Sequence, residues 1–289
     1  MFGKKILLIL WASAALAADF SGASALKFTG KIVSFGPRPP GSAAIRQLQS
    51  YLLAELKQCG CHVSEDNFTA RTPQGAVSMK NIIARFPGKS GRAVAFTGHY
   101  DTKILPGINF VGANDGGSSA GLLLEMARTL AGKPRRDDVY LVWFDGEEAF
   151  GQWSATDSLY GSRRLAGKWS ADGTLLRLKG LINVDMIGDR DLNIVQESYS
   201  SPALVRLVWQ VARDIGYGRY FNGRQTSIED DHMPFLRLGA PALDLIDFSY
   251  GPDHSWWHTS QDTMDKLSER SFQVVGDVLI ETLRRLEAQ

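Results

Sequence analysis

The chain has 289 residues, of which 44% are hydrophobic, 22% charged and 10% aromatic. These values are typical of folded globular domains and exclude disordered, collagen-like and coiled-coil chains. The 32 basic and 31 acidic residues give a formal net charge of +1, so nothing in the overall charge attracts nucleic acid or an anionic membrane. Two cysteines cannot form a disulfide scaffold or a four-thiolate zinc site, so any metal must be bound mainly by histidine and carboxylate.

The first 17 residues have the pattern of a secretory signal peptide. Lys4 and Lys5 precede an apolar run over 6–16, and residues 15–17 have the spacing of a signal-peptidase site. The run is about half the roughly 20 residues that a membrane-spanning helix needs, which favours an exported protein, periplasmic or secreted, over a stable membrane anchor. We therefore expect a single domain over 18–289. Cys59 and Cys61 would lie in an oxidising compartment, where both a disulfide and two free thiols remain open.

Strands and helices alternate along the rest of the chain. Apolar residues at helical spacing, such as Ile45, Leu48 and Leu52, predict helices, and short apolar runs predict buried strands. In chain order we expect a helix capped by Ser42, strands over 81–86 and 93–97, a helix over 118–130, strands over 139–144 and 181–186, a helix over 201–215, a strand over 242–246 and a final helix capped by Ser268. This alternation, without an internal repeat, predicts a three-layer α/β/α sandwich around a mostly parallel sheet.

Polar residues follow the ends of the expected strands, which is where open α/β sheets bind ligands. An aspartate after a strand is usually only a cap or a turn residue, but here a whole set occurs: His99–Asp101, Asp115, Asp145–Glu148, Asp185, Glu229–His232 and His258. Histidine and carboxylate side chains are suitable ligands for zinc. Because neighbouring side chains at a strand end point in different directions, one of Glu147 and Glu148 can bind metal while the other stays free as a base.

Several of these segments belong to longer motifs of a known family. The runs Phe96–Lys103, Gly112–Asp115, Asp145–Glu148 and Asn183–Gly188, followed by His258, resemble the zinc-dependent M28 peptidases. Five further runs resemble the glutaminyl cyclase branch of that family: Gly36–Ser42, Phe144–Phe150, Trp153–Ala166, Asp230–Arg237 and Trp257–Thr259. The resemblance extends from about Phe28 to the C-terminus. It implies a mixed, mostly parallel sheet of the zinc-aminopeptidase type.

The resemblance also implies a role for individual residues. Asp115, Glu148 and His258 match the three ligands of a single zinc ion, so one bound Zn²⁺ is expected. Glu147 matches the general acid/base, and Asp185 and Asp230 match carboxylates at the reaction centre. The substrate pocket is implied by matches at Trp257, Trp153 and Ile246. One departure is Asp244, which stands where animal members of the family have histidine and which puts the hydrogen-bond network beneath the site in question.

The implied reaction is cyclisation of N-terminal glutamine in peptides or proteins to pyroglutamate, with release of ammonia; N-terminal glutamate is a second candidate substrate. An intramolecular attack of the α-amine on the side-chain amide needs a folded substrate, an electrophile and a proton shuttle. Three protein ligands that leave one zinc position open, with Glu147 beside them, would supply these.

Two alternatives to this reaction stay open. A two-zinc M28 aminopeptidase would use His99, Asp115, Glu148, Asp185 and His258 to activate water. A binding domain that has lost catalysis would lack metal ligands, and this chain lacks none.

Two further histidines are expected to have ordinary roles. We expect His254 to be a solvated loop residue and His232, beside Asp230, to be a hydrogen-bond partner.

Overall fold

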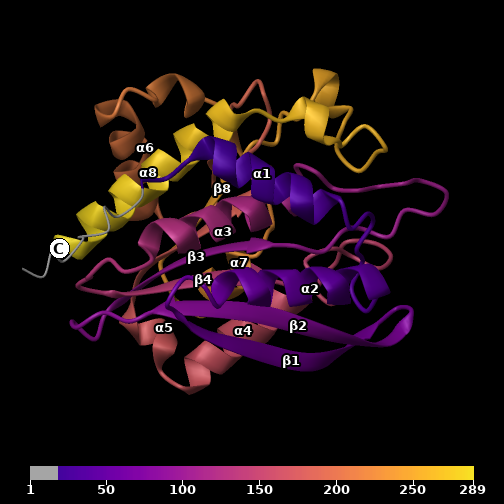
Figure 1. Ribbon diagram of the computed structural model, residues 1–289, viewed down its shortest axis with the longest axis horizontal. Coiled ribbons are helices and arrows are strands. Elements are labelled where there is room, and N and C mark those ends of the chain that lie inside the picture. The colour runs from indigo at the N-terminus through magenta and orange to yellow at the C-terminus, as the bar shows by residue number, and fades with distance from the viewer. Residues whose placement is uncertain (1–18) are drawn as a thin grey trace, which may run out of the picture.

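A six-stranded sheet organises residues 19–289, the part of the chain that the computed structural model describes (Figure 1). Its strands are β1 (His62–Thr72), β2 (Gly75–Phe86), β3 (Ala93–His99), β4 (Asp138–Phe144), β5 (Leu178–Asp185) and β8 (Ala242–Ile246), in the order β1-β2-β4-β3-β5-β8. β2 runs antiparallel to β1 and β4, whereas β4, β3, β5 and β8 are mutually parallel. The sheet is thus mixed and mostly parallel, as predicted.

Helices cover both faces of this sheet, which confirms the three-layer sandwich. The larger core cluster contains residues of α1 (Gly22–Val33), α2 (Ala43–Leu56), α3 (Gly117–Leu130), α6 (Pro202–Asp214) and α8 (Glu269–Glu287). The smaller cluster, on the other face, contains residues of α4 (Tyr160–Ala171), α5 (Thr174–Arg177) and α7 (Met233–Arg237). The remaining elements are short: β6 (Gln196–Glu197), β7 (Gln225–Thr226), η1 (Gly218–Tyr220), η2 (Pro252–His254) and η3 (Met264–Lys266).

The expected helix caps are confirmed. The Ser42 hydroxyl accepts a hydrogen bond from the Ile45 amide at 3.0 Å, and the Ser268 hydroxyl accepts one from the Ser271 amide at 3.2 Å. Each bond satisfies one of the amide groups that the first turn of a helix leaves without an intrahelical partner. The expected strands and the other two helices also form, with ends that differ by a few residues, and β2 begins six residues earlier than predicted.

Three longer elements were not predicted: α1, β1 and α4. β1 is an edge strand with mostly exposed polar residues, so it lacks the apolar alternation that indicates a strand. It forms because its residues pair with β2 along the whole hairpin, from His62 opposite Arg85 to Thr72 opposite Gly75. α4 begins after Leu159, which has a left-handed conformation and makes no side-chain cap, so the start of this helix has no sequence signal.

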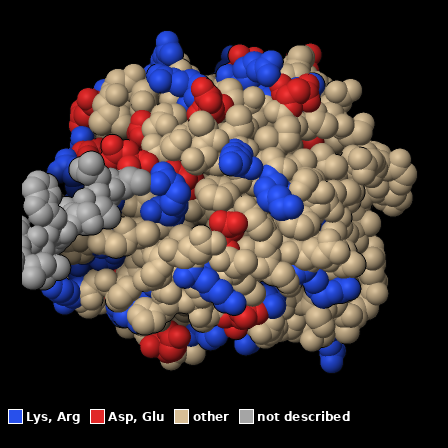
Figure 2. Space-filling model, viewed as in Figure 1, with Lys and Arg blue, Asp and Glu red and all other residues tan. Residues whose placement is uncertain are grey.

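The predicted signal peptide over 1–17 lies outside the described residues. Among the described residues, no helix is both long enough and apolar enough to cross a membrane. Cys59 and Cys61 are free thiols, each directed at a backbone carbonyl of the preceding helix end, so the disulfide left open above is not formed. On the face seen in Figure 2, basic and acidic side chains are interspersed, in keeping with the near-zero net charge.

The central strands are parallel, so the polar residues that follow them lie together beyond the carboxyl ends of the strands. All seven residues of β3 and of β4 are buried, because helices cover both faces of the sheet there. β3 lies between β4 and β5 in the sheet. The chain runs from β3 to its neighbour β4 on one side, whereas from β5, its neighbour on the other side, it runs on to β8 in the opposite direction along the sheet. This is the topological switch point at which open α/β sheets form a ligand crevice beyond the carboxyl ends of their strands.

Candidate active site

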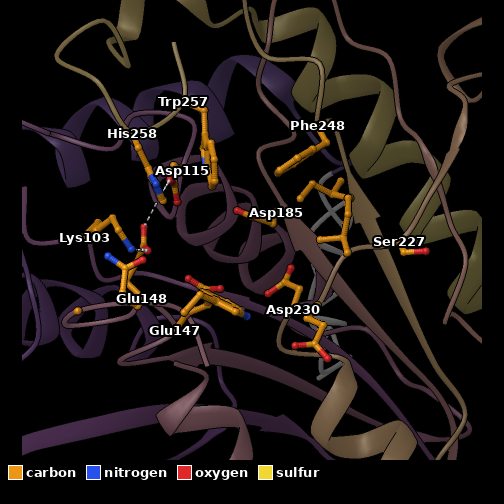
Figure 3. A pocket seen from close by; sticks show the side chains of 16 residues that line it. Lys103, Asp115, Glu147, Glu148, Asp185, Ser227, Asp230, Phe248, Trp257 and His258 are labelled. Atoms are coloured by element: carbon orange, nitrogen blue, oxygen red, sulfur yellow. Dashed lines mark hydrogen bonds and ion pairs between the residues drawn. The ribbon is translucent and has the colours of Figure 1, made fainter. Parts of the chain in front are cut away.

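A cavity of about 520 Å³ opens at this switch point (Figure 3). All nine residues to which the sequence analysis gave a role line it: Asp115, Glu147, Glu148, Trp153, Asp185, Asp230, Ile246, Trp257 and His258. Lys103 and Phe248 also line it and were not assigned a role. Side chains from at least five separate segments of the chain therefore converge on one concave surface.

Asp115, Glu148 and His258 form one group of possible metal ligands. His258 Nε2 lies 3.2 Å from Asp115 Oδ2 and 3.0 Å from Glu148 Oε1, and the three donor atoms lie within 4.8 Å of one another. Asp115 Oδ2 is buried, and among the described residues it has no hydrogen-bond partner beyond this approach to His258. Burial lowers the pKa of His258, but the two carboxylates outweigh it and raise that pKa to about 9. A donor set of one imidazole and two carboxylates that attracts positive charge fits a zinc ion.

Three features hold the loop that carries Asp115. The fully buried Arg38 donates to the carbonyl oxygens of Tyr100, Val111 and Gly112, at 2.8, 2.5 and 2.8 Å. The Asp262 carboxylate accepts from the amides of Asn114 and Asp115, at 2.7 and 3.1 Å.

Gly116 supplies the third feature, a backbone at φ 74° that favours glycine. A Cβ atom there would lie 2.6 Å from the Asp101 carbonyl oxygen. Arg38 belongs to the motif Gly36–Ser42, which predicted no role for it, and no sequence pattern indicated Asp262.

Glu147 and Glu148 lie on one turn after β4 but point to different places. The Asp101 carboxylate accepts from both of their amides, at 3.2 and 3.3 Å, and so fixes the turn. Glu148 faces His258 and also pairs with Lys103 at 3.2 Å, whereas Glu147 forms a separate wall of the cavity (Figure 3). Burial raises the pKa of Glu147 well above its usual range; His99 lowers it, and the nearby carboxylates raise it further. The surroundings of Glu147 thus favour its protonated form more than water does.

Asp185 and Asp230 form a carboxylate wall across the cavity. Burial raises the pKa of Asp185 to about 7 against the opposing effect of His99. The Asn183 side chain donates to Asp230 at 2.7 Å and to Asp244 at 3.1 Å. Asp244, the departure noted above, is therefore joined to Asp230 through one amide group. Burial, together with Asp230 and Asp185, raises the pKa of Asp244 well above its usual range.

The remaining wall is aromatic and aliphatic. Trp257 stacks on His258, with ring centroids 4.0 Å apart and planes 21° apart, and Ile246 ends β8 beneath them. Trp153 is 40% exposed at the cavity mouth.

Of the two expectations about other histidines, one was wrong and one is confirmed. Both ring nitrogens of His254 are buried and have no hydrogen-bond partner among the described residues, so His254 is not a solvated loop residue. The fully buried His232 is a hydrogen-bond partner as expected, and it pairs with Glu197 at 3.1 Å.

A second group of possible ligands shares Asp115. His99 Nε2 lies 3.1 Å from Asp115 Oδ1 and 3.2 Å from Asp185 Oδ1. The five positions named for a two-metal site therefore do converge, with Asp115 between the two groups. The geometry of the side chains is compatible with either one or two metal ions.

Known proteins resemble this chain over nearly its whole length. The family model for peptidase family M28 matches residues 81–283. A glutaminyl-peptide cyclotransferase of Bothrops jararaca is 34% identical, over 84% of this chain and 75% of its own length. The crystal structure of an Acidobacteriales bacterium glutaminyl cyclase has a TM-score of 0.90 and 41% identity, over 99% of both chains. A Zn-dependent exopeptidase of Parabacteroides distasonis has a TM-score of 0.82 and 27% identity, over 94% of this chain and 100% of its own.

These comparisons agree with the fold and with the residues that line the cavity. The fold and the cavity define an α/β enzyme with a candidate metal site at the switch point of its sheet. The chain belongs to peptidase family M28, and within that family to its glutaminyl cyclase branch.

Proposed function

We propose that the protein cyclises N-terminal glutamine of peptides or proteins to pyroglutamate and releases ammonia. The observation that carries this proposal is the cavity, which combines a candidate three-ligand metal group, a free carboxyl group at Glu147 and an aromatic wall. The 41% identity to a glutaminyl cyclase over 99% of both chains supports the same reaction. N-terminal glutamate is a further candidate substrate.

Asp115, Glu148 and His258 would hold one zinc ion. When bound there, zinc supplies Lewis acidity that polarises the γ-carbonyl group of the substrate glutamine. Arg38 and Asp262 keep Asp115 in place through the loop backbone, and Asp101 does the same for Glu148.

The substrate glutamine would lie folded between the carboxylates and the indole. Ile246 and Trp257 would contact its aliphatic carbons, and the open mouth beside Trp153 leaves room for the peptide that follows. Asp185 and Asp230 would accept hydrogen bonds from the α-amine and the side-chain amide. Binding would hold the amine close to the amide carbon. The entropic cost of bringing these two groups together would then be met on binding and would no longer add to the barrier to ring closure.

Glu147 would move the proton that the reaction transfers. The α-amine nitrogen forms a bond to the side-chain amide carbon, Cδ, and its proton passes to the Glu147 carboxylate. The bond from that carbon to the amide nitrogen then breaks, and Glu147 returns the proton so that neutral ammonia leaves. No water is consumed, and the carboxyl group ends in the state in which it began.

The alternative is a two-metal aminopeptidase. The observation that favours it is the approach of His99 to Asp115 and Asp185, which completes a five-ligand set. Identity is lower to the exopeptidase than to the glutaminyl cyclase, 27% against 41%, so we place cyclisation first.

One experiment separates the two reactions. Purified protein with zinc is incubated with a short peptide that begins with glutamine, and mass spectrometry is combined with an ammonia assay. Loss of one ammonia from an intact peptide supports the cyclase. Release of free glutamine and a shortened peptide would overturn that proposal in favour of the aminopeptidase. The same peptide with N-terminal asparagine is the matched control, because its shorter side chain would have to close a strained four-membered ring.

We also propose that the chain is exported to a periplasm or to the medium. The support is the basic, apolar and small-residue pattern of residues 1–17. Cell fractionation with N-terminal sequencing of the mature protein tests this, and a mature chain that still begins at residue 1 in the cytoplasm would contradict it.

A further inference from the structure

Four rings pack together along one wall of the cavity: Phe248, His254, Trp257 and His258, called the aromatic cluster below. The His254 centroid lies 4.4 Å from that of Phe248 and 4.9 Å from that of Trp257, and the Phe248 and Trp257 centroids lie 5.4 Å apart. Trp257 also stacks on His258, at 4.0 Å. Trp257 therefore contacts two imidazoles, that of the candidate metal ligand His258 and that of His254. Phe248 and Trp257 both line the cavity, and His254 packs against both.

The His254 imidazole takes part in this cluster through its ring contacts. Both ring nitrogens are buried, and neither has a hydrogen-bond partner among the described residues. Burial, together with the proximity of His258, lowers the pKa of His254. Because no hydrogen bond from the described residues orients this ring, its contacts with Phe248 and Trp257 are the interactions that position it.

The backbone of the same loop points to a constrained position. Asp253 and His254 have φ values of 48° and 63°, in the left-handed region that residues other than glycine seldom occupy. Such conformations persist only where the surrounding structure over-determines them. The His254 amide donates to the Gly251 carbonyl at 3.1 Å, and the His254 ring packs on Phe248 and Trp257. These ring contacts hold the side chain in place.

We propose that His254 is a positioning residue, whose ring keeps Trp257 stacked on His258 and so fixes the substrate-facing wall of the cavity. The proposal rests on the proposed function only in so far as Trp257 contacts substrate. His254 would touch neither substrate nor metal and would act through Trp257. The ring itself is required, whereas its nitrogens are not.

The test compares His254→Phe with His254→Ala in the full-length mature protein with zinc. His254→Ala is expected to raise KM about tenfold, the effect expected from the loss of two ring–ring contacts, with little change in kcat. His254→Phe restores the ring without the nitrogens and is expected to return KM to within about twofold of the unaltered protein. His62→Ala, at an exposed position on β1, is the matched control and should change neither constant.

A second readout does not depend on catalysis. The near-ultraviolet circular dichroism that Trp257→Phe removes is the signal of Trp257 in its stacked position. His254→Phe should keep this signal and His254→Ala should lose it, with zinc content unchanged in both. If His254→Ala fails to fold, His254→Gln, which also lacks a ring, takes its place in the comparison.

Two results would overturn the proposal. Equal impairment of His254→Phe and His254→Ala would show that the ring nitrogens matter. An unaltered Trp257 signal in His254→Ala would show that the ring does not position the indole. If the unaltered protein does not cyclise glutamine at all, the proposed function fails, while the spectroscopic comparison still decides the role of His254.

Discussion

Replacing Arg38 with methionine should destabilise the protein and weaken its metal site together. Burial lowers the pKa of Arg38 to about 10, so the guanidinium is still charged at neutral pH. It donates to three carbonyl oxygens around the loop that carries Asp115. Methionine fills much of the same volume but donates nothing, so three buried acceptors lose a donor.

The size of the effect follows from those three bonds. A buried acceptor without its donor costs about 1–3 kcal/mol, and the lower part of that range applies where water can enter, which gives about 3–5 kcal/mol in total. For a domain of this size each kcal/mol lowers the melting temperature by about 2–4 °C, so the midpoint should fall by about 6–20 °C. Because the affected loop carries Asp115, the stabilisation gained by adding zinc should also shrink.

Thermal unfolding of the metal-free and the zinc-loaded protein measures both effects. Arg46→Met is the matched control, because Arg46 is exposed on α2 and its side chain donates to the nearby Gly41 carbonyl. Its melting temperature should stay within about 2 °C of the unaltered protein, since surface substitutions usually change stability by less than 0.5 kcal/mol. An Arg38→Met protein that melts as the control does, with its full response to zinc, would refute the reasoning.

Three more predictions concern the metal site itself. Glu147→Gln should keep its zinc and lose kcat by a factor of about 10²–10⁴, because it removes a proton carrier and no ligand; metal analysis that finds the variant free of zinc would disprove this role. His258→Ala should bind less zinc and melt at a lower temperature, and undiminished zinc content would place the third ligand elsewhere. A chelator should lower the melting temperature and abolish turnover, and zinc at about 100 times its Kd should restore about 2.7 kcal/mol of stability; activity that survives complete removal of metal would contradict the zinc site.

Local patterns predicted the strands and helices that have a strong apolar period or a side-chain cap. They did not predict β1 or the start of α4, because β1 depends on its pairing with β2 and Leu159 offers no cap. The nine site residues were identified through long motifs and strand ends, and all of them line the cavity. Their chemical roles stay predictions.

The supporting residues were harder to find because their function lies in contacts between distant parts of the chain. Asp262 acts on the amides of Asn114 and Asp115, more than 140 positions earlier in the sequence. The burial of both His254 nitrogens likewise depends on the packing of a loop, and the motif around it suggested only a solvated turn.

The dependence of Asp115 on both Arg38 and Asp262 has a consequence for the order of events during synthesis. Arg38, Asp115 and Glu148 leave the ribosome long before His258 and Asp262. A chain that ends before these two residues lacks the ligand His258 and also lacks Asp262, which holds the loop of the ligand Asp115. The complete metal site can therefore form only after Asp262 has been made. If the chain crosses a membrane unfolded, as its proposed leader implies, the zinc available at the destination, and not at the ribosome, decides what fraction of the protein becomes active.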